Sequence, residues 1–561
     1  MEPTRWQKHY DPGVPSTLAP YPARTLLDCL ADTVRERPDH PFLLFKGTCL
    51  SYGEVERLSD GLAASLVAHG VGKGDRVAIV LPNCPQAIVA QLGAWKAGAI
   101  AAPINPLYTE RELEYTLQTC GATTAIVLTP FYVRVKHVQP RTAVTRVVAT
   151  SIKEHLPPLI RLLFTLLKER KGGHRIALEP GDLWFADLVG GRAGAPRPPV
   201  AIDKDDPALL LFTGGTTGTP KAAIGTHHGL LMSGMQINAW TRAALPDWEG
   251  SRMMAMPLFH VYGNVALVAS SIIGHNPIVL VPNPRDIDDV IATIRKARPA
   301  ALPGVPTLYI ALLEHPAVKA GKVDLRSIRL CVSGAAPLLA DTKRRFEAET
   351  GGRIIEGYSL TEAMLALIAN PVDGINKPGS VGVPLPDVEA RIVDSADGHI
   401  DLAPGQVGEL LLRAPQMMQG YWKAPDETAE VLRDGWLYTG DLAYMDEDGY
   451  TFIVDRKKDL IKPSGFQVWP REVEEVIAAH PAVSDVAVAG VSDAHQGEAV
   501  KAWVVLKPGA QATVAEIRAF CRECLVAYKV PKHVEFRASL PKTMIGKVLR
   551  RALRDEEKEP V

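Results

Sequence analysis

Apolar and polar positions repeat along the chain with two different periods. Residues 25–38 and 54–70 carry apolar side chains every three or four positions, which predicts amphipathic helices. Residues 75–82, 123–129 and 145–150 are short continuous apolar runs, as expected of buried strands. Helices that alternate with buried strands predict a layered α/β architecture. The same rhythm continues through four further runs, at 252–259, 276–282, 301–305 and 329–337.

The pattern changes at about residue 370 into strands separated by Gly and Pro. The last hundred residues then combine two helical patterns with three strand patterns, as in a small α+β unit. Between them, DRKKD at 455–459 is fully charged, which is typical of an exposed linker. A chain of 561 residues is too long for one core. We therefore expect a large α/β domain with a β-rich subdomain, an exposed linker, and a small α+β domain after it.

Composition excludes several classes of protein. Lys and Arg (62) balance Asp and Glu (63), so no overall positive field would attract nucleic acid. The N-terminus lacks the layout of a signal peptide, and charged or polar residues interrupt the longest apolar stretches. The seven cysteines are scattered, which suits reduced thiols in a cytoplasmic protein. Cys521 and Cys524 fall within a helical pattern without a second ligand pair, so we favour structural thiols over a zinc or redox site.

Residues 156–171 stand apart because a leucine-rich run is followed by the cluster Lys168, Arg170 and Lys171. The run is too short to cross a bilayer, but it could lie in the membrane surface. The alternative is a helix that caps the core. The sequence leaves both interpretations open. The first would place the protein in peripheral contact with the inner membrane surface.

Residues 209–224, LLLFTGGTTGTPKAAI, interrupt an apolar run with glycines and threonines before Lys221. Both flanks are typical of strands, so we expect a strand–loop–strand unit. Backbone N–H groups and threonine hydroxyls in such a loop suit an anion, although the Walker pattern is missing. An ordinary hairpin is the alternative.

Six further motifs follow this loop in order: PLFHVYG (257–263), SGAAPL (333–338), EGYSLTE (356–362), YTGD (438–441), DRKKDLIKPSGFQVWPREVE (455–474) and LPKTMIGKVLRR (540–551). Together they resemble the adenylate-forming (AMP-binding) superfamily along nearly the whole chain. NPLYTERELEY (105–115), TGGTTG and PGVPTLY (303–309) are most similar to bacterial long-chain fatty acid–CoA ligases. The resemblance implies an AMP-binding domain over 1–455, a hinge at 456–458, and a small mobile C-terminal AMP-binding-associated lid domain over 459–561.

The resemblance implies a nucleotide site in the large domain. The β- and γ-phosphates of ATP would contact Thr213, Gly214, Gly215, Thr216, Thr217, Gly218 and Lys221. The adenine would be framed by Gly334, Ala335, Ala336, Glu356, Gly357 and Tyr358. Magnesium would be held by Thr213 and Glu362, and the α-phosphate would lie near Thr361. The ribose would be held by Asp441, and Arg456 would help to hold the ribose or phosphate. His260 would lie between the carboxylate and the acyl pocket, with a packing role as the alternative.

The resemblance also implies that the small domain serves two steps. Lys547 would bridge carboxylate and α-phosphate during adenylation, although alone it could be an exposed lysine in a basic tail. Lys458 matches the hinge. The face that turns in for thioester formation with coenzyme A would consist of Lys462, Ser464, Gly465 and Gln467.

The implied function is ATP-dependent activation of a long-chain fatty acid to an acyl-adenylate, followed by transfer to coenzyme A that gives acyl-CoA, AMP and pyrophosphate. The implied cofactors are ATP, Mg²⁺ and coenzyme A. Three alternatives remain: an aryl- or medium-chain acyl-CoA ligase, an enzyme with a carrier-protein acceptor, and a non-enzymatic homologue. The last is disfavoured because Lys547, Asp441 and Glu362 are all present. Ser359 replaces a glycine frequent in the family close to the acyl pocket, which leaves the substrate length open. Homodimers are frequent in this branch, and the sequence does not decide the oligomeric state.

Overall fold

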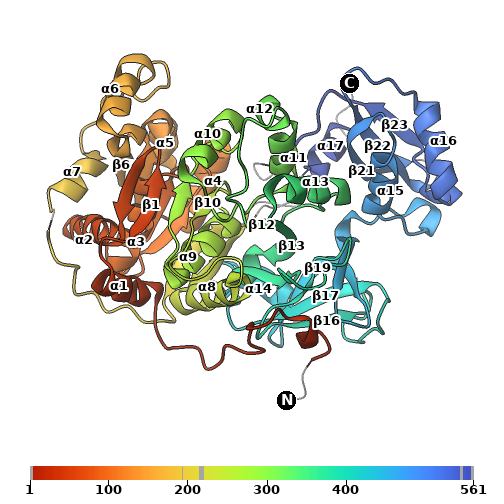
Figure 1. Ribbon diagram of the computed structural model, residues 1–561, viewed down its shortest axis with the longest axis horizontal. Coiled ribbons are helices and arrows are strands. Elements are labelled where there is room, and N and C mark those ends of the chain that lie inside the picture. The colour runs from red at the N-terminus through yellow and green to blue at the C-terminus, as the bar shows by residue number, and fades with distance from the viewer. Residues whose placement is uncertain (1–3, 193, 214–219, 494, 544–547, 558–561) are drawn as a thin grey trace.

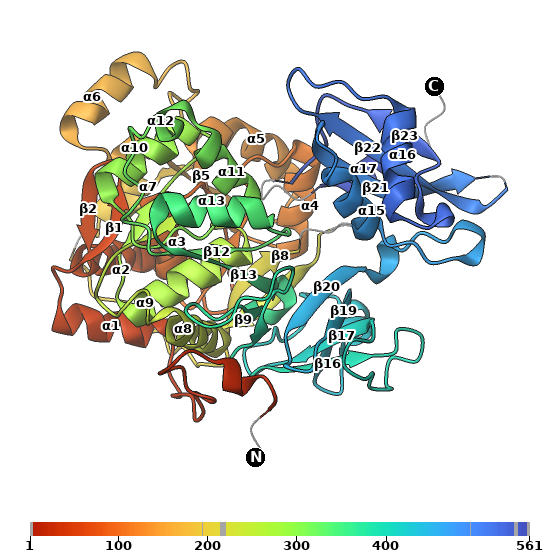
Figure 2. The same ribbon diagram turned by 45° about the vertical axis from the view of Figure 1, so that its right-hand side comes forward.

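The chain forms a large body with a smaller one at its side (Figure 1). A computed structural model describes residues 4–192, 194–213, 220–493, 495–543 and 548–557. The large body contains sheets covered by helices and a β-rich part, and the small body is an α+β unit (Figure 2). The predicted fold class is therefore confirmed.

A seven-stranded sheet forms the centre of the N-terminal part, and only its β8–β9 pair is antiparallel. Successive residues of a strand point to opposite faces. Val77 and Ile79 of β3 therefore enter one apolar cluster, with α2 (Tyr52–Ala68) and α3 (Pro85–Lys96). Ala78 and Val80 enter another, with α4 (Glu110–Cys120) and α5 (Tyr132–Val138). In order across the sheet, the strands are β7 (Leu183–Trp184), β6 (Arg146–Thr150), β5 (Thr124–Leu128), β3 (Arg76–Val80), β4 (Ile100–Pro103), β8 (Pro207–Phe212) and β9 (Ala222–Thr226).

Two four-stranded sheets follow, and single bridges through Ala301 connect them. The expectation of a strand over 301–305 is wrong, because only isolated bridges form there. Pro303 has no N–H group to continue a ladder. The first sheet contains β10 (Arg252–Met254), β11 (Ile278–Leu280), β1 (Pro41–Phe45) and β2 (Thr48–Ser51), and the second β12 (Leu330–Ser333), β13 (Arg353–Leu360), β14 (Leu365–Ala369) and β15 (Val383–Pro384).

The C-terminal parts confirm the predicted change to strand-rich structure. The β-rich subdomain contains β16 (Glu389–Val393), β17 (Gly408–Arg413), β18 (Leu432–Arg433), β19 (Trp436–Met445) and β20 (Thr451–Arg456). The small domain contains β21 (Val483–Asp493), β22 (Gly497–Leu506) and β23 (His533–Phe536), with α15 (Pro470–Ala478), α16 (Val514–Cys524) and α17 (Arg550–Glu556). In α16, Cys521 is buried, Cys524 is exposed and both are free thiols.

Several helices of the large domain start where the sequence provides a capping side chain. Thr25 with Asp28, Ser51 with Glu54, and Thr109 with Glu112 form capping boxes. The helices are α1 (Leu26–Glu36), α2 (Tyr52–Ala68), α3 (Pro85–Lys96), α4 (Glu110–Cys120), α5 (Tyr132–Val138), α6 (Pro158–Leu167), α7 (Phe185–Gly190), α8 (His227–Thr241), α9 (Ser270–Gly274), α10 (Ile287–Ala297), α11 (Pro306–Glu314), α12 (Pro316–Lys319), α13 (Ala340–Thr350) and α14 (Pro425–Val431).

Helix α6 corresponds to the leucine-rich segment, and none of its residues is buried. The interpretation as a helix that caps the core is therefore wrong, because a capping helix buries its apolar face. Among the residues that the structure describes, no helix has the length and apolar character needed to cross a membrane.

Buried His227 generates a prediction about stability and pH. Its ring packs edge-on against Trp95, and burial lowers its pKa to about 4 from 6.5. The unfolded chain binds a proton on this histidine at a higher pH than the folded chain, so the contribution of neutral His227 to stability is present above pH 6.5 and is lost towards pH 4. His227→Gln should weaken this loss, seen as a smaller difference in apparent melting temperature between the two pH values. His399→Gln, at an exposed position, is the control. Equal acid sensitivity of wild type and His227→Gln would contradict the prediction.

Candidate functional site

Asp441 and Arg456 face each other across two antiparallel strands. They are register partners on β19 and β20, and Arg456 Nε lies 3.2 Å from Asp441 Oδ1. The other carboxylate oxygen of this buried aspartate accepts a 2.5 Å hydrogen bond from the hydroxyl of Tyr358. Burial, reinforced by Asp441, raises the pKa of Tyr358 well above its usual value, so the phenol remains a donor. Arg456 of the predicted hinge and Tyr358 of the predicted adenine site thus meet at the carboxylate of Asp441, the predicted ribose residue.

The loop after β12 is attached to the strand that carries Tyr358. The backbone N–H of Leu338 donates to Glu356 Oε1 at 3.2 Å, and burial raises the pKa of this carboxyl group. Ala335 has φ +67°, a left-handed conformation that turns the chain sharply. The predicted adenine residues Gly334–Ala336 and Glu356–Tyr358 are therefore close together in space.

His260 is connected to the same loop through Tyr262. Its Nδ1 accepts a 3.2 Å hydrogen bond from the backbone N–H of Tyr262, which begins a π-helix over Tyr262–Ala269. The Tyr262 hydroxyl donates to the carbonyl oxygen of Val332 at 2.7 Å, and a Cβ added at Gly334 would lie 3.4 Å from the Tyr262 ring. His260 is half-buried beside the loop rather than part of the deep core.

Thr213, Lys221 and Glu362 are joined through Tyr421. The N–H of Lys221 donates to Thr213 Oγ1 at 3.2 Å, and its Nζ lies 5.1 Å from the centre of the Tyr421 ring. The Tyr421 hydroxyl donates to Glu362 Oε1 at 2.7 Å. Burial, followed by the Glu362 charge, raises the pKa of Tyr421 well above its usual value. Thr361 adjoins this carboxylate in the short helix Thr361–Ala363.

These oxygen atoms suit a hard cation. Magnesium prefers oxygen ligands and is usually held by one or two carboxylates together with substrate phosphates. A hydroxyl and a carboxylate fit that pattern. Within the described ranges, no cluster of three His, Cys, Asp or Glu side chains could hold a metal by itself.

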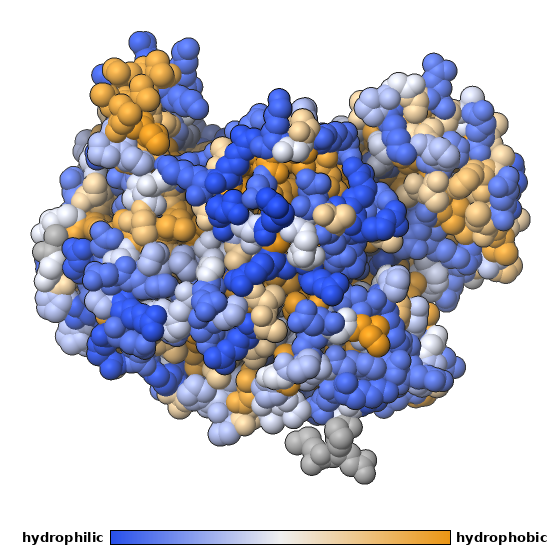
Figure 3. Space-filling view, viewed as in Figure 1, coloured by the Kyte–Doolittle hydropathy of each residue, from blue (hydrophilic) through white to orange (hydrophobic). Residues whose placement is uncertain are grey.

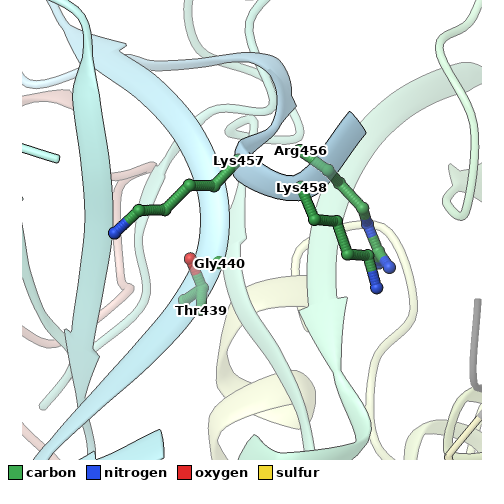
Figure 4. Close-up of a pocket in the computed structure, with 5 residues that line it drawn as sticks. All are labelled: Thr439, Gly440, Arg456, Lys457 and Lys458. Carbon is green, nitrogen blue, oxygen red and sulfur yellow. The ribbon is translucent and has the colours of Figure 1, made fainter. Parts of the chain in front are cut away.

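The predicted hinge residues Arg456, Lys457 and Lys458 line a cavity of about 270 Å³ together with Thr439 and Gly440. Figure 4 shows Arg456 and Lys458 extending to one side and Lys457 to the other. Lys457 pairs with the buried carboxylate of Glu409 at 2.8 Å. Burial, assisted by the positive charge of Arg456, lowers the pKa of Lys458. Two cationic side chains on one side of this cavity would favour an anionic ligand.

The other predicted small-domain residues form a separate face. The backbone N–H of Lys462 donates to Glu498 at 2.7 Å, and Ser464 has φ 51° in the short helix Pro463–Gly465. Gln467 is exposed. A hollow of about 460 Å³ beside this segment is lined by small-domain residues such as Tyr528, whose ring stacks on Phe466 at 4.7 Å. The face is thus built apart from the Asp441 site.

Several predicted residues lie outside the described residues: Gly214, Gly215, Thr216, Thr217, Gly218 and Lys547. Their flanks are described, and β8 and β9 confirm the strand–loop–strand prediction. Sequence reasoning missed Tyr421, Lys457 and Glu409. Lys457 had one signal, its position between Arg456 and Lys458, whereas the other two had none.

Comparison with known proteins decides the family. The AMP-binding enzyme family matches residues 30–422, and the AMP-binding enzyme C-terminal domain matches 472–547. The chain belongs to the AMP-binding enzyme family. The predicted membership of the adenylate-forming superfamily is confirmed.

Individual relatives cover nearly the whole chain. A long-chain-fatty-acid–CoA ligase of Bacillus subtilis (strain 168) is 41% identical over 99% of this chain and 98% of its own. A feruloyl-CoA synthase of an Amycolatopsis species is 33% identical over 91% and 94%. The crystal structure of ATP-bound MatB from Rhodopseudomonas palustris is 30% identical, has a TM-score of 0.81, and covers 96% of this chain and 99% of its own.

Asp441→Asn tests the ribose assignment. The substitution keeps the shape but removes the charge opposite Arg456, and it should raise KM for ATP by about 10- to 100-fold, as for the loss of one or two charge-assisted hydrogen bonds. Steady-state kinetics with ATP as the varied substrate measure the effect. Asp401→Asn, which changes an exposed ion pair with Arg391, is the matched control. An unchanged KM for ATP in Asp441→Asn would reject the assignment.

Proposed function

We propose that the chain is an ATP-dependent fatty acid–CoA ligase that forms acyl-CoA, AMP and pyrophosphate. One observation carries the proposal: Asp441, Arg456 and Tyr358 meet at the proposed hinge. The chain also matches a long-chain fatty acid–CoA ligase over 99% of this chain and 98% of that relative. A carboxylate is a poor acyl donor because oxide would have to leave. Conversion to an acyl-adenylate provides AMP as the leaving group.

In the first half-reaction, a carboxylate oxygen of the acid attacks the α-phosphorus of ATP, and the bond from that phosphorus to pyrophosphate breaks. Two anions approach each other, so positive charge is needed where they meet. We assign this charge to Lys547, and we assign the departing pyrophosphate to residues 213–221. Thr213 and Glu362 would hold magnesium, which when bound supplies positive charge beside the phosphates.

The nucleotide would be oriented by the groups gathered around Tyr358. Asp441 can accept from two ribose hydroxyls, because a carboxylate has two oxygens. The loop of Gly334–Ala336 and the strand segment Glu356–Tyr358 would enclose the adenine, Thr361 would lie near the α-phosphate, and His260 would border the acyl group. The left-handed turn at Ala335 and the Glu356–Leu338 bond support this arrangement.

In the second half-reaction, the thiolate sulfur of coenzyme A attacks the acyl carbon, and the bond from that carbon to AMP breaks. We assign the approach of the thiol to Lys462, Ser464, Gly465 and Gln467, after the domain over 459–561 turns about Lys458 relative to 1–455. The polar hinge 456–458 supports such a rotation. A cytoplasmic location and a homodimer belong to the same proposal.

A panel of acids tests the substrate class. Long-chain fatty acids should release AMP faster than short-chain or aryl acids, and release should depend on coenzyme A. The panel includes ferulate, because one relative is a feruloyl-CoA synthase. Preference for ferulate would favour the aryl-CoA ligase alternative. AMP release that does not respond to coenzyme A would favour a different acceptor.

Two lysine variants test the division of labour. Lys547→Ala should lower acid-dependent pyrophosphate exchange by about 10²- to 10³-fold, as for the loss of one charge-stabilising group. It should still transfer pre-made acyl-AMP to coenzyme A. Lys462→Ala should show the opposite pattern, and Lys542→Ala, which removes a small-domain ion pair with Asp485, is the control. Equal loss of both half-reactions in either variant would contradict the assignment.

A further inference from the structure

Helix α6 presents an apolar face that no other part of the described chain covers. Five leucines are exposed by 47% or more: Leu159, Leu162, Leu163, Leu166 and Leu167. Figures 1 and 2 both show α6 projecting from a corner of the large domain. In Figure 3 the same corner is a concentrated hydrophobic patch. Exposed apolar patches of this kind mark interaction surfaces.

The helix is held in a fixed orientation although it is exposed. Phe164, on its inner side, packs edge-on against His174 at 5.1 Å. The salt bridge between Lys153 and Glu169 connects the segments before and after the helix. These contacts keep one side of α6 against the protein and leave the leucines on the other.

The charged side chains near the leucines are nearly all positive. With 3.6 residues per turn, the five leucines fall within an arc of about 140°. Arg161 and Lys168 lie on the side of the helix opposite that arc, and Arg170 and Lys171 follow the helix; all four are exposed. The one acidic residue between 156 and 178 is Glu169, which is paired with Lys153. The helix therefore combines an exposed apolar face with exposed positive charges on its other side and directly after its end.

We infer that α6 docks this protein onto an anionic lipid surface. The ten-residue helix is about 15 Å long, half the hydrocarbon thickness of a bilayer, so it would lie flat with its leucines in the acyl region. The cations on its polar side and after its end would lie at the level of the headgroups and attract lipid phosphates. A second copy fits less well, because a contact between the leucine faces would give these cations no anionic partner. The inference rests on the proposed function in one respect, since a fatty acid substrate partitions into the same bilayer.

Co-sedimentation of the full chain with vesicles tests the inference. The wild type should bind vesicles of phosphatidylglycerol and phosphatidylcholine at least 10-fold more strongly than vesicles of phosphatidylcholine alone, and salt should weaken binding. The double variant Leu162→Glu, Leu166→Glu should lose at least 10-fold of that binding, because two leucines that would enter the acyl region are replaced by charged side chains. Ile400→Glu, at a position with 60% exposure far from α6 in the sequence, should bind like the wild type.

Three outcomes would overturn the inference: equal vesicle binding by the leucine variant, equal binding to neutral and anionic vesicles, or conversion of a dimer to a monomer by the leucine variant with unchanged vesicle binding. Light scattering supplies the oligomeric state. Turnover of a detergent-dispersed fatty acid is measured in parallel and should be the same in all variants. Vesicle binding without turnover would contradict the proposed function and leave the docking surface intact, so the two failures can be distinguished.

Discussion

The pairing of Asp441 with Arg456 connects the proposed nucleotide site to the proposed hinge. The two residues are cross-strand neighbours at the end of the β19–β20 pair, and the chain enters residues 456–458 directly after it. A nucleotide held by Asp441 would therefore lie beside the point about which we propose that the small domain turns. The hinge cavity with Arg456 and Lys458 on one side follows from the same register.

A second group of charges holds the small domain in the observed orientation. Asp455, the buried neighbour of Arg456, accepts from the backbone N–H of Arg471 at 2.8 Å and lies 3.3 Å from Arg550. Arg550 also pairs with Glu474 at 2.7 Å, and these charges raise the pKa of its guanidinium despite burial. Asp455 belongs to β20, whereas Arg471 and Arg550 belong to α15 and α17. A rotation about 456–458 has to break their contacts with Asp455.

The sequence predicted structure best where the signal was local. Helices α1 and α2 and the β8–β9 hairpin follow directly from periodicity and capping residues. Contacts between distant residues were not predictable, because a pattern within one segment does not reveal its partner. The Tyr421–Glu362 bond joins residues 59 positions apart. For α6, periodicity established an amphipathic helix but not which environment its apolar face meets, and only the exposure of its leucines excluded the core.

The candidate site shows the same contrast between local sequence signals and contacts of residues far apart in the chain. Motifs identified Asp441, Arg456 and Tyr358, whereas their register and hydrogen bonds needed coordinates. Glu409 carried no motif, yet it pairs with Lys457 and accepts from the N–H of Gly440 at 3.2 Å. It supports the hinge through burial and charge rather than through a recognisable residue pattern.

We propose that one small domain serves both half-reactions by turning about residues 456–458. The chain offers one exposed cysteine in each domain, Cys49 and Cys524, for a fluorescent donor and acceptor. Energy transfer between them should have one value with ATP and a fatty acid analogue that cannot react, and a different value once a stable acyl-adenylate analogue and coenzyme A are bound. A single unchanged efficiency under both conditions, in labelled protein that still turns over, would contradict the account.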